Sequence, residues 1–269
     1  MQLDSSVVDY IAEFSGTALV TSALGFALAK SRDGLALSTS ATMAFIYTLA
    51  FIAFNGNVST GFNPAVTLVS TLVPGRKQVS MTKRLITVLV QLVAALIGVA
   101  ITRALYLPYD EDLDLLSVLM GNYRRDDKEA AIFVIHWLLE SISVAGLVLL
   151  SLRSWHDKKP NGWWPLFVGF VYYVPGYVFR VYSGALNTVL PMAFTLNPAV
   201  VFGVVLTRSA GMISVTDSFA AVVFPWTCQI CGALLGVALW RVLQEEGKCG
   251  YLPPYKLDSE TEEKSEAET

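Results

Sequence analysis

Six apolar segments, each long enough to cross a lipid bilayer as a helix, constrain this chain more than any other feature of its sequence. A bilayer core about 30 Å thick requires roughly 20 helical residues to cross it. The segments cover residues 10–30, 38–55, 85–106, 130–151, 163–182 and 219–242. Because backbone groups inside lipid must find hydrogen-bond partners within the protein, these segments predict a bundle of membrane-spanning helices.

The composition supports a membrane protein and argues against several other classes. Of the 269 residues, 54% are hydrophobic and only 15% are charged, whereas a soluble domain carries about a quarter charged residues. A net charge of −3 argues against a nucleic-acid partner, which would require a basic face for the phosphates. The sequence contains no phosphate-binding loop, metal-ligand cluster or nucleophile with a partnered histidine. We therefore expect neither an enzyme nor a site for a cofactor or metal.

Two shorter apolar segments, 64–73 and 198–207, are too short to span a membrane and are predicted to be buried or re-entrant helices. Both begin with the same tripeptide, since Asn63-Pro64-Ala65 heads the first and Asn197-Pro198-Ala199 heads the second. The chain therefore divides into two halves of three spans, each with a short helix after its second span. Because three is odd, the halves must insert with opposite orientations, and such paired short segments point to a site near the bilayer midplane.

The distribution of charge predicts the topology. The link after the second span is basic and the link after the third is acid-rich, so the positive-inside rule places both termini in the cytosol. We expect a cytosolic N-terminus over 1–9, a channel domain over 10–243 and a disordered acidic tail over 244–269. The channel domain would comprise repeats over 10–106 and 130–243. Either the plasma membrane or an intracellular membrane fits these features. The positive charge of the link after the second span comes from Arg76, Lys77, Lys83 and Arg84.

The tripeptide Asn-Pro-Ala suits the head of a short helix for physical reasons. Proline fits the first helical position, and the asparagine side-chain oxygen caps the first turn, which leaves its NH2 group as a donor. If the two helices meet head to head, two donors and two positive dipole ends converge. A water that accepts from both Asn63 and Asn197 would point its hydrogens outward and interrupt proton transfer. The pair predicts passage of water or small neutral solutes without protons or ions.

With these features the sequence resembles the aquaporin and glycerol-facilitator family, the major intrinsic proteins, over about residues 9–243. The resemblance implies an all-α membrane protein with six transmembrane helices, two re-entrant half-helices and inverted three-span repeats. It also implies a homotetramer in the lipid bilayer with one pore per subunit, and it assigns Glu13 and Glu140 to bracing the re-entrant loops. Besides the Asn-Pro-Ala boxes, the matching residues are Ala12 to Phe14, Gly16, Thr17, Gln91, Gly98, Glu140, Phe202, Gly203, Gly232 and Ala233.

The sequence departs from the family pattern after the second box, where Val200 replaces the usual arginine of the outer constriction. Family spacing places the other constriction positions at Met43, Ala185 and Phe194. This apolar, uncharged lining predicts that larger neutral solutes such as glycerol, urea and peroxide also pass. Arg180 has two interpretations: it reaches the outer vestibule and partly replaces the missing arginine, or it extends to the membrane interface.

No ligand-binding role is expected for His136, Tyr172 or Tyr173. His136 is expected at the membrane interface, and Tyr172 and Tyr173 are expected in the interfacial belts and lining.

Three alternatives to a conducting channel stay open. The first is a divergent intracellular member of the family that conducts water poorly. The second is a coupled secondary transporter, which needs an ionisable group facing the pore, and only Glu13 and Glu140 are candidates. The third is a structural membrane protein with a closed pore.

Overall fold

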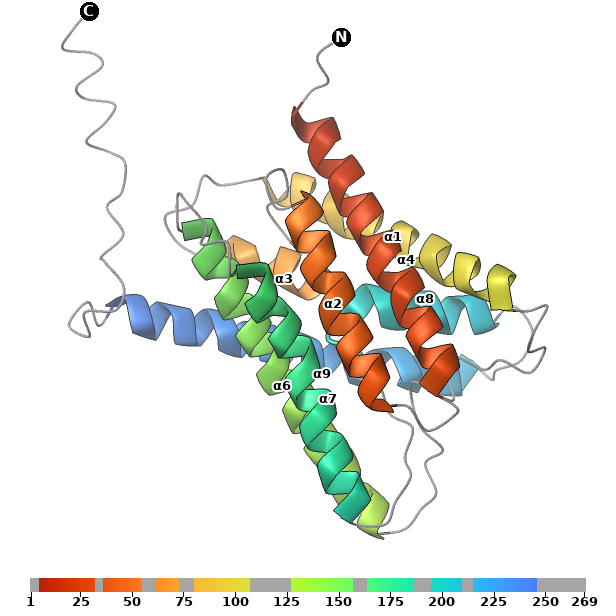
Figure 1. Ribbon diagram of the computed structural model, residues 1–269. Coiled ribbons are helices and arrows are strands. Elements are labelled where there is room, and N and C mark those ends of the chain that lie inside the picture. The colour runs from red at the N-terminus through yellow and green to blue at the C-terminus, as the bar shows by residue number, and fades with distance from the viewer. Residues whose placement is uncertain are drawn as a thin grey trace, which may run out of the picture.

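The computed structural model describes eight stretches of the chain, and within them all regular structure is helical. This confirms the all-α class. The described residues are 5–31, 36–54, 61–72, 80–106, 127–156, 164–185, 195–209 and 215–245. The long helices are α1 (Ser5–Ser31), α2 (Ala36–Phe54), α4 (Met81–Tyr106), α6 (Asp127–His156), α7 (Trp164–Ala185) and α9 (Val215–Glu245). The short helices, which lie among the long ones in Figure 1, are α3 (Pro64–Val69), continued by the 3-10 turn η1 (Ser70–Leu72), and α8 (Pro198–Ser209).

Each predicted span falls on one of the long helices, and only residue 55 of the second span and residue 163 of the fifth lie outside the described residues. Among the described side chains, three stretches have both the length and the hydropathy of a membrane span: Met81–Leu105, Val134–Leu152 and Val222–Leu243. Shorter apolar stretches cover Ala41–Phe54 in α2, Pro165–Pro175 in α7 and Pro198–Thr207 in α8. The predicted acidic link and the acidic tail lie outside the described residues, apart from their helical ends.

The two halves of the chain pack in the same way. Helix α1 packs against α4 and α2 in the first half, and α6 packs against α9 and α7 in the second. Between the halves, α4 contacts α8 while α9 contacts α3, and the equivalent helices α2 and α7 contact each other. Figure 1 shows α6 and α7 running side by side, as α1 and α2 do. This pairing is the one that two inverted repeats related by a pseudo-two-fold axis produce.

Glycines allow close helix crossings in both halves. A Cβ atom on Gly98 of α4 would lie 2.7 Å from the carbonyl oxygen of Ala18 in α1. A Cβ atom on Gly236 of α9 would lie 2.8 Å from the carbonyl oxygen of Ala145 in α6. Helices in a membrane associate through such small residues because lipid provides no hydrophobic drive between them. The two crossings are therefore equivalent, and each is possible only without a side chain.

The start of α4 corrects one prediction of the sequence analysis. Lys83 and Arg84 were expected in the link between spans, but α4 begins at Met81 and includes both residues. Lys83 Nζ lies 3.0 Å from Asp9 Oδ2 in α1, and Arg84 is buried. The helix extends beyond the apolar stretch because these basic side chains find partners or cover within the protein. The ion pair places the first turns of α1 and α4 at the same end of the molecule.

Candidate functional site

The two short helices begin with the same cap. Asn63 precedes α3 in an extended conformation, and its Oδ1 accepts from the backbone N–H of Ala65 at 2.9 Å. Asn197 precedes α8, and its Oδ1 accepts from the N–H of Ala199 at 3.0 Å. A proline follows each asparagine at the first helical position, where its missing N–H costs nothing. Each carboxamide oxygen is thus engaged with its own helix, and each NH2 group is directed elsewhere.

The two asparagines donate across the boundary between the halves. Asn63 Nδ2 donates to the carbonyl oxygen of Leu196 at 2.6 Å, and Asn197 Nδ2 donates to that of Phe62 at 2.7 Å. Both asparagines are fully buried. The short helices therefore meet head to head through two reciprocal hydrogen bonds. In this conformation both amides bind protein acceptors.

The residues before the asparagines adopt an unusual backbone conformation. Phe62 has φ of 62° and Leu196 has φ of 50°, the left-handed region that costs a non-glycine residue roughly 1–2 kcal/mol. In this conformation the N–H of Phe62 donates to Glu13 Oε2 at 3.2 Å, and the N–H of Leu196 donates to Glu140 Oε1 at 2.8 Å. Each residue thus binds the glutamate of its own half and the asparagine of the other. These bonds hold the strained loops in place.

Each glutamate also binds a glutamine from the last span of its half. Gln91 Nε2 of α4 donates to Glu13 Oε2 at 2.8 Å, and Gln229 Nε2 of α9 donates to Glu140 Oε1 at 2.8 Å. Glu140 Oε1 accepts a further bond from the hydroxyl of Thr195 at 3.3 Å. From the sequence, Gln91 was predicted only as a residue that matches the family, and no role was predicted for Gln229. One oxygen of each carboxyl group therefore accepts from the loop and from a neighbouring helix.

Two arginines bind the far ends of the short helices. Arg103 of α4 donates to the carbonyl oxygen of Thr207 in α8, and Arg241 of α9 donates to that of Leu72 at 2.6 Å. In each case the cation meets a C-terminal helix end in the opposite half, where the dipole is negative. Neither arginine was predicted from the sequence. The signal was available, because Gln91 and Arg103 have the same spacing as Gln229 and Arg241.

The four predicted constriction residues are only partly described. Met43 of α2 and Val200 of α8 are buried in one hydrophobic cluster. Arg180 and Ala185 lie near the end of α7, where the side chains are outside the described residues, and Phe194 is outside them entirely. The grouping of the four residues and both interpretations of Arg180 stay predictions.

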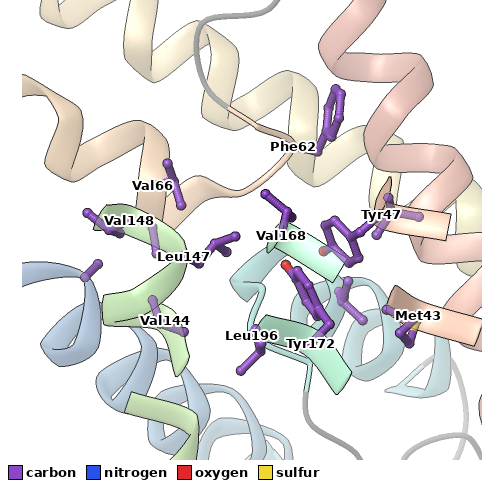
Figure 2. Close-up of a cluster of buried hydrophobic side chains, with 14 of the residues drawn as sticks. Met43, Tyr47, Phe62, Val66, Val144, Leu147, Val148, Val168, Tyr172 and Leu196 are labelled. Carbon is purple, nitrogen blue, oxygen red and sulfur yellow. The ribbon is translucent and has the colours of Figure 1, made fainter. Parts of the chain in front are cut away.

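Two tyrosines lie beside the asparagines, and the sequence analysis did not place them there. The rings of Tyr47 in α2 and Tyr172 in α7 are stacked, with their centroids 3.7 Å apart and their planes inclined by 15°. The Tyr47 hydroxyl accepts a hydrogen bond from Asn197 Nδ2 at 3.0 Å. Tyr172 was expected in the interfacial belts and lining; it is buried in the central cluster with Met43 and Leu196 and so does not lie at the interface (Figure 2). The residue type does not determine this position, because tyrosine is also common at membrane interfaces. The packing of α7 against α2 places Tyr172 inside the bundle.

His136 also differs from its expected place at the interface. It lies one turn before Glu140 on α6, with Nε2 3.8 Å from Glu140 Oε2, and 14% of its side chain is exposed. Among the described residues, no group of three or more histidines, cysteines or acids is arranged to hold a metal ion.

Comparisons with known proteins agree with this architecture. A model of the family named Major intrinsic protein matches residues 2–191. The X-ray structure of the aquaglyceroporin from Plasmodium falciparum matches with a TM-score of 0.63 over 91% of this chain and 98% of that chain. At 15% identity, this likeness concerns the fold. A search among curated proteins finds no match.

The family assignment confirms several predictions made from the sequence. The aquaporin-like all-α fold, the integral membrane location and the absence of an enzymatic role all follow from it. The chain belongs to the major intrinsic protein family and forms a membrane channel for water or small solutes.

Proposed function

We propose that this channel conducts water and small neutral solutes such as glycerol, urea and peroxide past Asn63 and Asn197, and that it excludes protons and ions. One observation carries the proposal: the two short helices meet head to head through the bonds from Asn63 to Leu196 and from Asn197 to Phe62. This contact brings two amide donors and two positive helix ends to one place inside the bundle. The outer faces of the long helices carry exposed apolar side chains suited to lipid.

The exclusion of ions follows from the chemistry of that meeting point. The positive ends of α3 and α8 repel cations, and an asparagine donor orients a passing molecule by its acceptor oxygen. A water oriented in this way cannot donate toward the asparagines, so the chain of hydrogen bonds that a proton needs is interrupted. Neutral molecules with an acceptor oxygen can pass under the same conditions.

The proposal that larger neutral solutes also pass depends on the residues that line the passage. Val200 follows the second Asn-Pro-Ala box and belongs to the buried cluster that also contains apolar residues of α2 and α7. Without an arginine at this position, the passage has no fixed charge there. It also lacks the hydrogen-bond donors that an arginine side chain would direct at a solute. We propose that Met43, Ala185, Phe194 and Val200 form the outer constriction, and that glycerol therefore passes.

Assembly and orientation belong to the same proposal. Four copies would form a homotetramer with one pore per subunit, with both termini in the cytosol. The ion pair between Lys83 and Asp9 supports the orientation, because it joins the starts of α1 and α4 at one membrane face. The channel domain would cover 10–243, with the remaining tail on the cytosolic side.

A second candidate, a family member that conducts water poorly, is favoured by one specific observation. In the described conformation Asn197 donates to Tyr47 and to Phe62, so its NH2 group is occupied by protein acceptors. The coupled transporter is less well supported, because Glu13 and Glu140 each bind a loop N–H and a glutamine. That arrangement suits bracing, which we propose as their role.

The test is stopped-flow light scattering on proteoliposomes of the full chain, with a pH-sensitive dye inside the vesicles. We expect water and glycerol fluxes above those of empty vesicles, a low activation energy for water and no proton leak. Exchanging the amide for a carboxylate in Asn197→Asp should reduce water flux and admit protons or cations. Gly146→Ala is the control, because its new Cβ would meet its nearest neighbour at 3.8 Å. Ion currents driven by a solute gradient would instead establish coupled transport.

A further inference from the structure

Two tyrosines from different halves fill the space next to the Asn-Pro-Ala boxes. Tyr47 is fully buried and Tyr172 is 2% exposed, and their helices α2 and α7 pack along each other. The ring centroids are 3.7 Å apart, which is van der Waals contact between aromatic faces. A water molecule cannot fit between rings in such contact. Figure 2 shows the two rings side by side in the cluster that includes Met43, Val168 and Leu196.

The Tyr47 hydroxyl accepts from one of the two N–H donors of the Asn197 side chain. A carboxamide NH2 group has two N–H donors. In Asn197 they serve the Tyr47 hydroxyl at 3.0 Å and the Phe62 carbonyl at 2.7 Å. The Phe62 bond belongs to the contact between the short helices, so the donor directed at Tyr47 is the one that could instead serve a solute. Tyr47 therefore holds the acceptor position that a permeating oxygen would take.

The second tyrosine holds the first in place. Tyr172 covers one face of the Tyr47 ring over a stack inclined by only 15°, and Met43 and Val168 belong to the same buried cluster. The contact keeps one face of each ring away from water, so separating the rings costs the burial of that apolar surface. Moving Tyr47 away from Asn197 thus requires both a hydrogen bond and a ring contact to be broken.

We propose that Tyr47 and Tyr172 form a gate at the level of the Asn-Pro-Ala boxes, an inference that rests on the proposed channel function. Passage requires the rings to separate, and the entering molecule replaces the Tyr47 oxygen as acceptor from Asn197. The gate therefore also selects: it admits small neutral molecules that carry an acceptor oxygen, such as water, glycerol and urea. Molecules of similar size without such an oxygen leave the Asn197 donor unpaired and are disfavoured.

The experiment compares water and glycerol permeability of full-length variants in proteoliposomes. Tyr47→Phe removes the hydroxyl and keeps the ring, whereas Tyr47→Val and Tyr172→Val remove the ring contact. We expect Tyr47→Phe to raise water permeability about fivefold, which corresponds to the roughly 1 kcal/mol of one hydrogen bond. The two valine variants should raise water permeability at least as much, lower its activation energy and admit glycerol faster.

The matched control is Tyr173→Val. Tyr173 neighbours Tyr172 on α7 and is also stacked, on Tyr177 with ring centroids 6.0 Å apart, but it lies outside the buried cluster. Its loss should leave permeability unchanged. Size-exclusion chromatography and the amount of reconstituted protein normalise all fluxes. If a valine variant does not fold, Tyr47→Phe decides, because it changes a single oxygen atom.

The outcomes separate the gate from the channel function. Higher flux in the Tyr47 variants supports both, including the case in which the unmodified protein conducts little. Flux through the unmodified protein that equals flux through Tyr47→Phe and Tyr47→Val overturns the gate and leaves the channel function standing. An absence of flux in every variant overturns both.

Discussion

At the scale of single residues, the loops before the short helices depend on two buried carboxylates. Glu140 Oε1 accepts from Leu196, Gln229 and Thr195, and Leu196 holds a left-handed backbone. A buried carboxyl group in a membrane protein requires such partners. The carboxylate therefore stabilises a backbone conformation that Leu196 would otherwise avoid, and that conformation directs the Leu196 carbonyl to Asn63.

We expect Glu140→Ala to destabilise the folded protein clearly. The substitution leaves the buried Leu196 N–H and one N–H of the Gln229 amide without an acceptor, which costs about 1–3 kcal/mol for each group. The midpoint of thermal unfolding in detergent should fall by several degrees, and Glu140→Gln, which keeps a side-chain oxygen, should lose less. Ser143→Ala on the same helix is the control, because within the described part of the chain its hydroxyl bonds the carbonyl of Leu139 in its own helix. Equal midpoints for Glu140→Ala and Ser143→Ala would contradict this role.

Some of the residues that stabilise the loops could be predicted from the sequence, and others could not. Glu13 and Glu140 were identified because they recur in both halves and match a family motif. Gln229 and Tyr47 were missed, since a glutamine or tyrosine in an apolar segment fits many environments. Their roles depend on which helix crosses opposite them.

At the scale of helices, the crossings of α1 with α4 and of α6 with α9 are equivalent contacts. Both depend on a glycine that faces a carbonyl oxygen, Gly98 on Ala18 and Gly236 on Ala145. Backbones this close exclude side chains from the crossing point, so the crossing also sets where Gln91 and Gln229 meet the glutamates.

We expect Gly236→Val to separate α9 from α6. Its Cβ would lie 2.8 Å from the carbonyl oxygen of Ala145 and from Val148 Cβ, and forced overpacking of this kind costs typically 1–3 kcal/mol. The fraction of monodisperse protein in size-exclusion chromatography and the unfolding midpoint should both fall. Gly146→Ala should change neither, since its Cβ meets Val171 at 3.8 Å. A Gly236→Val protein as stable as Gly146→Ala would show that α6 and α9 can separate without cost.

At the scale of the whole molecule, the outer surface predicts contact with lipid and with further copies. Large apolar side chains are exposed along the outer faces of the helices, for example Leu89 in α4, Ile142 in α6 and Phe170 in α7. In water such a surface would aggregate, and in a membrane it is compatible with lipid or with a neighbouring subunit.

We expect the purified protein to have the mass of four chains. Light scattering coupled to size-exclusion chromatography, with the detergent contribution subtracted, measures this mass directly. Chemical crosslinking in native membranes should give bands up to four chains and no higher. A single-chain mass in both mild detergent and lipid nanodiscs would contradict the tetramer.

The order of residues was enough to predict a membrane protein with six spans, two short helices and an internal repeat. These follow from hydropathy, segment length and a repeated tripeptide, which are properties of the chain in order. The contact partners were decided only by the tertiary structure. Asn197 binds Tyr47 and Phe62, and Arg241 binds Leu72. These contacts form because the two inverted halves bring residues that are far apart in the sequence next to each other. Which side chains occupy the centre of the bundle depends on helix rotation and crossing, and no local pattern encodes those.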